Sequence, residues 1–292
     1  MRRFVLPIVS GLLLLSACNR AGSLAPTDVL NRATSAAADL QSAEYDVQVD
    51  FGINNKTVDA TATAALHGAV ARGGQESAFS LTLKASSKRA GQSTTVDLAG
   101  DVVTDAKNVF VQLHTLAISP ETTALHNSKD MLNKWWQIAR DDTGASLHTL
   151  TPDPSFLRAQ SAVVTVTKDK GIETVNGRDA YHYLVTIDPE RLLALMKTSA
   201  EARGTAFDAT ATRAELAQYN ANGELWIDAE TFVLHKLSWT VTSKETPPAM
   251  HLQFTVGLGK HNQAGPIAIP TKATPFQPEL LIQRLLSSPG AL

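Results

Sequence analysis

The chain has 292 residues with a formal net charge of −2, and 18% of them are charged. No basic stripe interleaved with aromatic residues occurs, so we do not expect a nucleic-acid partner. Hydrophobic residues make up 43% of the chain, which is ordinary for a globular protein. After the N-terminal segment, no stretch of about 18 consecutive apolar residues predicts a membrane-spanning helix.

The N-terminus has the order of an export signal. Arg2 and Arg3 precede an apolar run from Phe4 to Leu15, and small residues follow it. The run of about a dozen residues is shorter than the roughly 20 that a spanning helix needs. We therefore expect a signal peptide rather than a membrane anchor.

The sequence "LSAC" at residues 15–18 resembles the lipobox of bacterial lipoproteins, and its cysteine is the only one in the chain. The resemblance implies that Cys18 carries diacylglycerol and becomes the first residue of the mature protein. Residues 1–17 are then a signal peptide, residues 18–25 a lipidated tether and residues 26–292 a single domain. The protein would be exported to the cell envelope and anchored in the outer membrane or on the outer face of the cytoplasmic membrane. The alternative is an ordinary exported protein with one buried or reactive thiol.

A helix is expected over residues 27–42, because apolar residues recur there at helical spacing and Asp28 lies in the first turn. Strict alternation of apolar and polar residues then predicts strands, each with one buried face and one wet face. The expected strands cover residues 45–53, 57–69, 76–86, 93–104, 107–114, 133–139, 162–174, 179–188, 223–228, 232–241 and 249–258.

Short connections predict that consecutive strands form antiparallel hairpins. Asn176-Gly177 and Asn222-Gly223 are expected as turns, because a type I′ turn needs positive φ at both central residues. Asp188-Pro189-Glu190 predicts the start of a helix over 189–200, with a cap, a first-turn proline and an acid. A third helix is expected after Pro278, near 279–287, and residues 204–222 are expected to form a loop with a weak helix.

These elements predict an α+β, mainly β, fold. We expect a large curved antiparallel sheet, a half-barrel of about ten or eleven strands, with a few helices covering its concave face.

Catalytic and metal-binding motifs are missing from the sequence. The eight histidines are scattered without ligand spacing, and no phosphate loop or GxSxG elbow occurs. His235 is expected to be a core histidine with a partner, and Asp141-Asp142 is interpreted as part of a loop. We therefore predict that the protein is not an enzyme and needs no cofactor or metal.

Three segments together resemble the half-barrel superfamily of lipoprotein carriers and receptors (LolA/LolB-like) and are similar to the mycobacterial LppX/LprG lipoproteins. They are "NKWWQIA", "ETVNGRDAYHYLVTID" followed by "PERLLALM", and "GELWIDAETFVLHKLSW". The resemblance implies binding of a lipid or acylated ligand in an apolar cavity, for transport or envelope assembly, with another envelope protein as a further partner.

A cavity of this kind would be lined by inward residues of the strands and of the second helix. The candidates are Phe79, Leu81, Leu83, Trp135, Tyr181, Tyr183, Leu192, Met196, Leu237 and Trp239. Trp135 and Trp136 are adjacent, so they face opposite sides of a strand. The alternative to a lipid carrier is a non-catalytic sensor, or a structural protein-interaction module, in which the helices fill the concavity.

Overall fold

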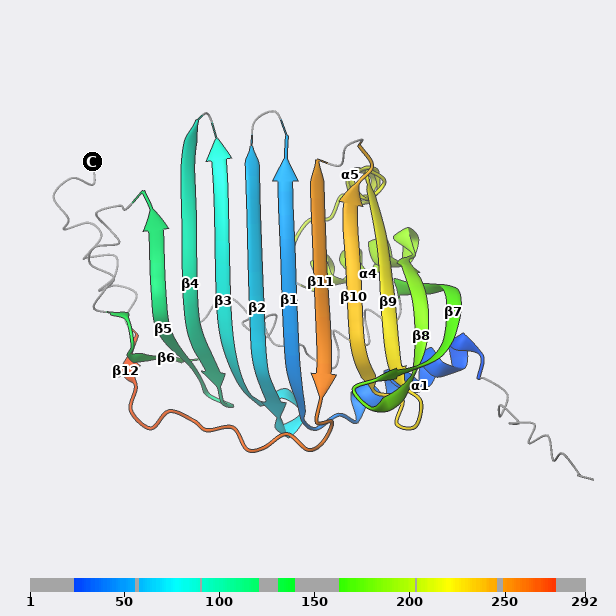
Figure 1. Cartoon of the computed structure of the whole chain (residues 1–292), viewed down its shortest axis with the longest axis horizontal. Coiled ribbons are helices and arrows are strands. Elements are labelled where there is room, and N and C mark those ends of the chain that lie inside the picture. Colours follow the sequence, from blue (N-terminus) through cyan, green and yellow to red (C-terminus); the bar gives the residue numbers. More distant parts are fainter. Residues whose placement is uncertain are drawn as a thin grey trace, which may run out of the picture.

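The computed structural model describes residues 24–55, 58–89, 91–120, 131–139, 163–202, 204–245 and 249–276. One twelve-stranded sheet dominates it, with the strand order β12-β6-β5-β4-β3-β2-β1-β11-β10-β9-β8-β7 (Figure 1). The strands are β1 (Ala43–Asn54), β2 (Asp59–Ala71), β3 (Glu76–Arg89), β4 (Gln92–Thr104), β5 (Asn108–Ser119), β6 (Trp135–Ala139), β7 (Val164–Val175), β8 (Arg178–Ile187), β9 (Tyr219–Asp228), β10 (Leu234–Ser243), β11 (Met250–Gly259) and β12 (Thr274–Pro275).

Strands that follow one another in the chain lie beside one another, so the sheet consists of two meanders. The first contains β1 to β6 and the second β7 to β11, and antiparallel pairing of β1 with β11 joins them. The segment after β11 runs along one end of the strands and brings β12 beside β6 in parallel (Figure 1). The predicted mainly β fold with a large, open, curved antiparallel sheet is confirmed, and all eleven predicted strands are present.

The two Asn-Gly pairs have different roles. Asn176 and Gly177 have φ values of 52° and 80° and form the expected turn between β7 and β8. The prediction of a turn at Asn222-Gly223 is wrong, because both residues lie inside β9. Gly223 is needed there because Trp239 packs over it: a Cβ atom would lie 2.7 Å from the indole ring.

The described helices are α1 (Pro26–Ala38), α4 (Pro189–Ala202) and α5 (Ala209–Leu216), with a short 3₁₀ turn η1 (Arg72–Gly74) between β2 and β3. As predicted, Asp188 caps α4, since its Oδ1 accepts hydrogen bonds from the N–H groups of Glu190 and Arg191. The helix expected at 279–287 lies outside the described residues. None of the described helices is long and apolar enough to span a membrane.

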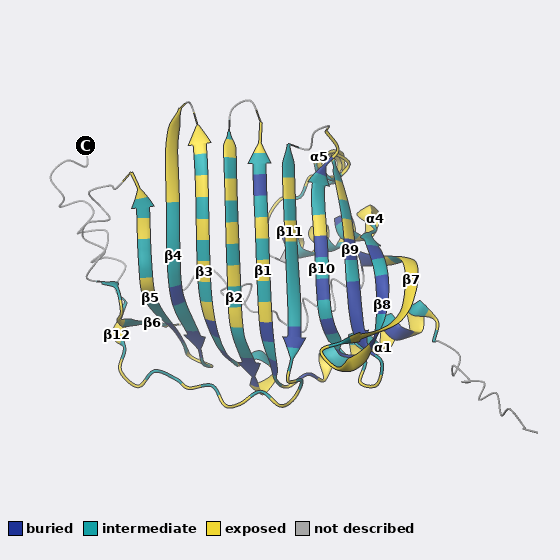
Figure 2. Ribbon diagram, in the orientation of Figure 1, coloured by how far each residue is buried: buried dark blue, intermediate teal, exposed yellow. Residues whose placement is uncertain are grey.

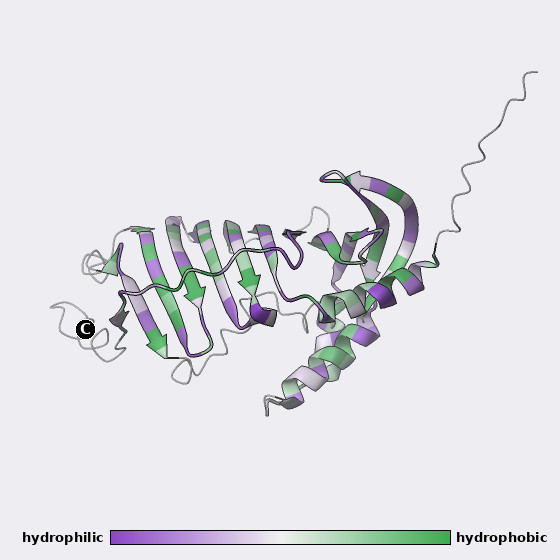
Figure 3. Ribbon diagram, turned by 90° about the horizontal axis from the view of Figure 1, so that it is seen from below, coloured by the Kyte–Doolittle hydropathy of each residue, from purple (hydrophilic) through white to green (hydrophobic). Residues whose placement is uncertain are grey.

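The helices gather at the β7–β10 end of the sheet (Figures 1 and 3). There α1 buries Val29 completely against a cluster that includes Tyr183, Leu237 and Trp239. A second cluster joins the end of α1 to the ends of β1, β2 and β3 near η1. Figure 2 accordingly shows buried positions concentrated in β8 to β10 and at one end of the other strands.

Candidate functional site

The register of the strands gives one face of the sheet to apolar side chains. Leu83 of β3 pairs with Ala64 of β2 and with Leu98 of β4. Across the junction, Trp239 of β10 pairs with Phe254 of β11. Because paired residues in an antiparallel sheet project to the same side, these side chains share one face, which we call the apolar face.

Most of the predicted cavity residues lie on this apolar face. Cross-strand pairing places Leu237 beside Val256 and Tyr183 beside Leu225. The same alternation within β3, β8 and β10 places the remaining strand residues there: Phe79, Leu81, Leu83, Tyr181 and Trp239.

The prediction that Trp135 lines the cavity on the apolar face is wrong. It pairs with Gln112 on β5, which belongs to the opposite face, whereas its neighbour Trp136 pairs with Val111 and therefore shares the apolar face. Trp136 donates a hydrogen bond to the carbonyl of Met131 and packs edge-on against Phe276.

The two α4 residues of the set have no place in either cluster of buried residues. Leu192 is partly buried, and Met196 is 37% exposed. Cys18 lies outside the described residues. The sequence analysis missed Val164, Leu225 and Ile227, which join the cluster under α1, and strict alternation within β9 could have identified Leu225.

The apolar face is closed at one end and partly exposed along the rest. Under α1 the crevice between helix and sheet has a volume of about 60 Å³. Beyond the two buried clusters, apolar side chains of β1, β3, β4, β5 and β11 remain partly exposed: Phe51, Leu83, Leu98, Ile118 and Leu252. The face therefore offers apolar surface that the described residues do not bury completely.

The opposite face, which we call the polar face, carries hydroxyl, amide and charged side chains. Two shallow grooves cross it, with volumes of about 500 and 440 Å³. Their lining includes Gln48, Thr63, Thr82, Lys84, Thr95 and Asp97. Acidic residues of this face pair with histidines of neighbouring strands, as Asp50 does with His251 at 2.8 Å.

His182 is the most buried histidine of the polar face and is held between two carboxylates. Its Nδ1 lies 2.8 Å from Glu173 and its Nε2 2.7 Å from Glu224, while its ring stacks on Trp226. Trp226 donates its indole N–H to Glu173, and this hydrogen bond lowers the pKa of that carboxyl group. Lys236 lies 4.7 Å from the centre of the Trp226 ring. Both ring nitrogens of His182 and the indole N–H of Trp226 thus have partners within the cluster.

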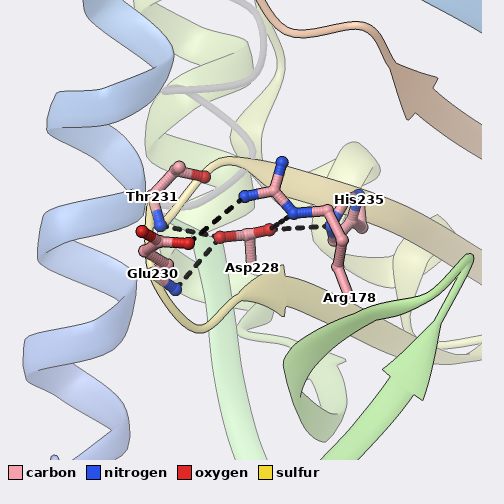
Figure 4. Close-up of polar contacts among 5 residues, drawn as sticks. All are labelled: Arg178, Asp228, Glu230, Thr231 and His235. Carbon is pink, nitrogen blue, oxygen red and sulfur yellow. Dashed lines mark hydrogen bonds and ion pairs between the residues drawn. The ribbon is translucent and has the colours of Figure 1, made fainter.

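A buried carboxylate, Asp228, fastens the β9–β10 hairpin (Figure 4). Its side chain is 1% exposed, and its Oδ1 accepts hydrogen bonds from the N–H groups of Glu230 and Thr231. Its Oδ2 lies 2.8 Å from Nε of Arg178 and 2.9 Å from Nε2 of His235. The predicted role of His235 as a core histidine with a partner is therefore confirmed.

The environment of Asp228 stabilises its charged form. Burial alone would raise the pKa of this carboxyl group, but the N–H donors of Thr231 and Glu230 and the charge of Arg178 outweigh it and lower the pKa.

Among the described residues, no group of three or more His, Cys, Asp or Glu side chains is arranged to hold a metal ion.

No protein-family model and no curated protein matches the sequence of the chain. Among solved structures, the lipoprotein LppX of Mycobacterium tuberculosis is 12% identical, with a TM-score of 0.37, over 84% of this chain and 100% of that one. LprF of Mycobacterium bovis is 15% identical, with a TM-score of 0.39, over 86% and 100%. A LolA superfamily protein of Nitrosomonas europaea is 9% identical, with a TM-score of 0.21, over 84% and 96%. All three of these similarities have TM-scores of 0.39 or lower.

Asp228→Asn tests the role of the buried charge. The substitution keeps the shape and the acceptor for the backbone N–H groups but removes the charge that faces Arg178 and His235. At pH 7 we expect the free energy of unfolding to fall by about 1.5–3 kcal/mol, the contribution of hydrogen bonds to a charged group. Urea unfolding monitored by tryptophan fluorescence measures it.

The lowered pKa of Asp228 predicts how the stability difference between wild type and Asp228→Asn changes with pH. A folded-state pKa below the unfolded value stabilises the fold above the unfolded pKa, and this contribution is lost as the pH falls through the folded value. The difference between wild type and Asp228→Asn should therefore shrink below about pH 4. The control is Glu230→Gln, whose side chain is 90% exposed and should change little. A difference that is constant from pH 3 to 7 would contradict the role given to Asp228.

Proposed function

We propose that this protein is an exported, lipid-anchored protein of the cell envelope whose apolar sheet face binds the acyl chains of a lipid or acylated molecule. One observation carries the proposal: the apolar face continues beyond the part that α1 covers, and its side chains there remain partly exposed. An incompletely buried apolar face in a protein of this size is typical of a binding surface.

Acyl chains suit such a face because their binding needs no specific polar partner. Burying one methylene group contributes about 0.8 kcal/mol. Ten methylenes on this face would therefore favour binding by several kcal/mol, even after the cost of ordering the chain. The face supplies large, rigid aromatic and branched side chains for such contacts, among them Phe51, Leu83 and Leu98.

The described residues also indicate where a lipid would not bind. The crevice under α1 holds about 60 Å³, whereas ligand pockets usually have about 300–1,000 Å³. The β7–β10 end is thus a filled core, and we place the acyl chains over β1 to β5. The same filled core favours the second candidate, a non-catalytic sensor or structural module, if the whole face is packed in this way.

Leu83→Trp distinguishes the two functions. Leu83 lies in the middle of the proposed surface, so the larger side chain should exclude an acyl chain and abolish lipid retention. Overpacking costs typically about 1–3 kcal/mol, which a domain of this size tolerates. Native mass spectrometry of the intact protein extracted in detergent, combined with lipid extraction, measures the retained lipid.

The matched control is Thr82→Trp, the adjacent residue of β3, which lines a groove of the polar face. It should leave the retained lipid unchanged. A wild-type protein without lipid, together with a sharp loss of thermal stability in Leu83→Trp, would reject lipid binding and favour the filled module.

Cys18→Ser tests the anchor separately. Two or more acyl chains hold a protein durably on a bilayer, and the lipobox resemblance places them on this residue alone. We expect the variant to lose incorporation of labelled palmitate and to move from the membrane fraction to the soluble fraction. Unchanged labelling and membrane association would show that the anchor lies elsewhere.

A further inference from the structure

The second half of β7 is an exposed ribbon at the edge of the sheet, and we call residues Thr167–Thr174 the β7 ribbon. β7 is the last strand of the sheet, and every residue of the β7 ribbon is exposed. Its Ile172 is 58% exposed, more than any other large apolar side chain among the described residues. A single exposed apolar residue is common on protein surfaces, so its meaning depends on what lies around it.

Two irregularities in the pairing with β8 reshape the β7 ribbon. The register shifts between Val166 and Lys168 and again between Asp169 and Gly171. Gly171 has a φ of 86°, and its N–H donates a hydrogen bond to Oδ1 of Asp169. Bulges of this kind bend an edge strand and increase its twist, and they hinder pairing with the edge of another sheet.

Two lysines, Lys168 and Lys170, lie in the β7 ribbon close to Ile172. Neither of them forms an ion pair with a described residue, whereas the carboxylate of Glu173 is engaged by His182 and Trp226. Protection of a sheet edge explains lysines and bulges. It does not explain an exposed isoleucine, because an apolar side chain favours association rather than preventing it.

The N-terminal tether reaches the fold at the same corner of the sheet. Leu24 packs against the buried cluster under α1, and so does Tyr181, the cross-strand partner of Ile172. Figure 1 shows α1 beside the β7 and β8 end of the sheet. Leu24 is six residues after Cys18, and a chain of that length spans at most about 22 Å. An acyl anchor on Cys18 would therefore hold this corner close to the bilayer.

We propose that the β7 ribbon rests on the surface of the lipid bilayer. Ile172 enters the boundary between headgroups and acyl chains, and Lys168 and Lys170 contact lipid phosphates. The inference rests on the proposed anchor at Cys18. Because the tether already confines the β7 ribbon to the neighbourhood of the bilayer, a few weak contacts are enough to orient the domain.

This contact gives the sheet a defined orientation. The β7 edge faces the bilayer, and the β6 edge points away from it. β1 is the fifth strand from β7, which places it about 24 Å farther along the sheet. An acyl chain bound over β1 to β5 is then lifted clear of the headgroups.

The inference is tested with the intact, acylated protein in vesicles of phosphatidylethanolamine and phosphatidylglycerol. The thiol of Cys18 is blocked by its lipid, so Ile172→Cys provides the single site for an environment-sensitive fluorophore. We expect its emission to shift to the blue in vesicles and to be quenched by spin-labelled lipid. Thr82→Cys is the matched control, because Thr82 is also exposed and lies seven strands from β7. Its fluorophore should report water.

A second variant tests the lysines. Lys168→Glu combined with Lys170→Glu, in the labelled Ile172→Cys protein, should abolish the quenching and leave flotation with the vesicles unchanged. In protein that floats, a fluorophore at position 172 that reports water, equal quenching at positions 172 and 82, or quenching that survives both glutamates would overturn the inference and leave the anchor intact. Protein that does not float with the vesicles would overturn the anchor, and the inference with it.

Discussion

The alternation of apolar and polar residues along the antiparallel strands is the constraint from which the other features follow. It gives the sheet two chemically different faces, and a slip of one residue in any strand would exchange them. Pairing of β1 with β11 carries the same alternation across the two meanders, as Val47 opposite Val256 shows. The apolar face must then be covered, and α1 covers it at the β7–β10 end.

Polar interactions fix how the connecting segments sit on this sheet. Asp228 ties the β9–β10 turn to β8 through its ion pair with Arg178. Asn262 fastens the long segment after β11 to the chain before β1. Arg213 of α5 and Glu190 of α4 form a two-point ion pair that joins the two helices. The sheet thus provides the surface, and a few charged contacts determine what lies against it.

Local signals predicted the strands and the cap of α4 because each depends on residues close in sequence. Alternation over a strand of ten or more residues determines its faces, and Asp188 satisfies N–H groups only two and three residues away. Trp135 was assigned to the wrong face because β6 has five residues, too few for alternation to decide. The turn at Asn222-Gly223 was predicted wrongly because the reason for the glycine is the ring of Trp239, which packs over it from another strand. The ring contact between His235 and His261, with 5.3 Å between the centroids, depends on tertiary structure, and the spacing of the two residues in the sequence does not predict it.

The central claim is that acyl chains lie on the apolar face over β1 to β5. A fatty acid with a photoreactive group at the end of its chain, added to the intact protein and activated by light, tests it most directly when peptide mass spectrometry maps the cross-links. The account predicts cross-links at Leu83, Leu98 and Phe51. Cross-links confined to the polar face, or none above those of the unactivated sample, would contradict it.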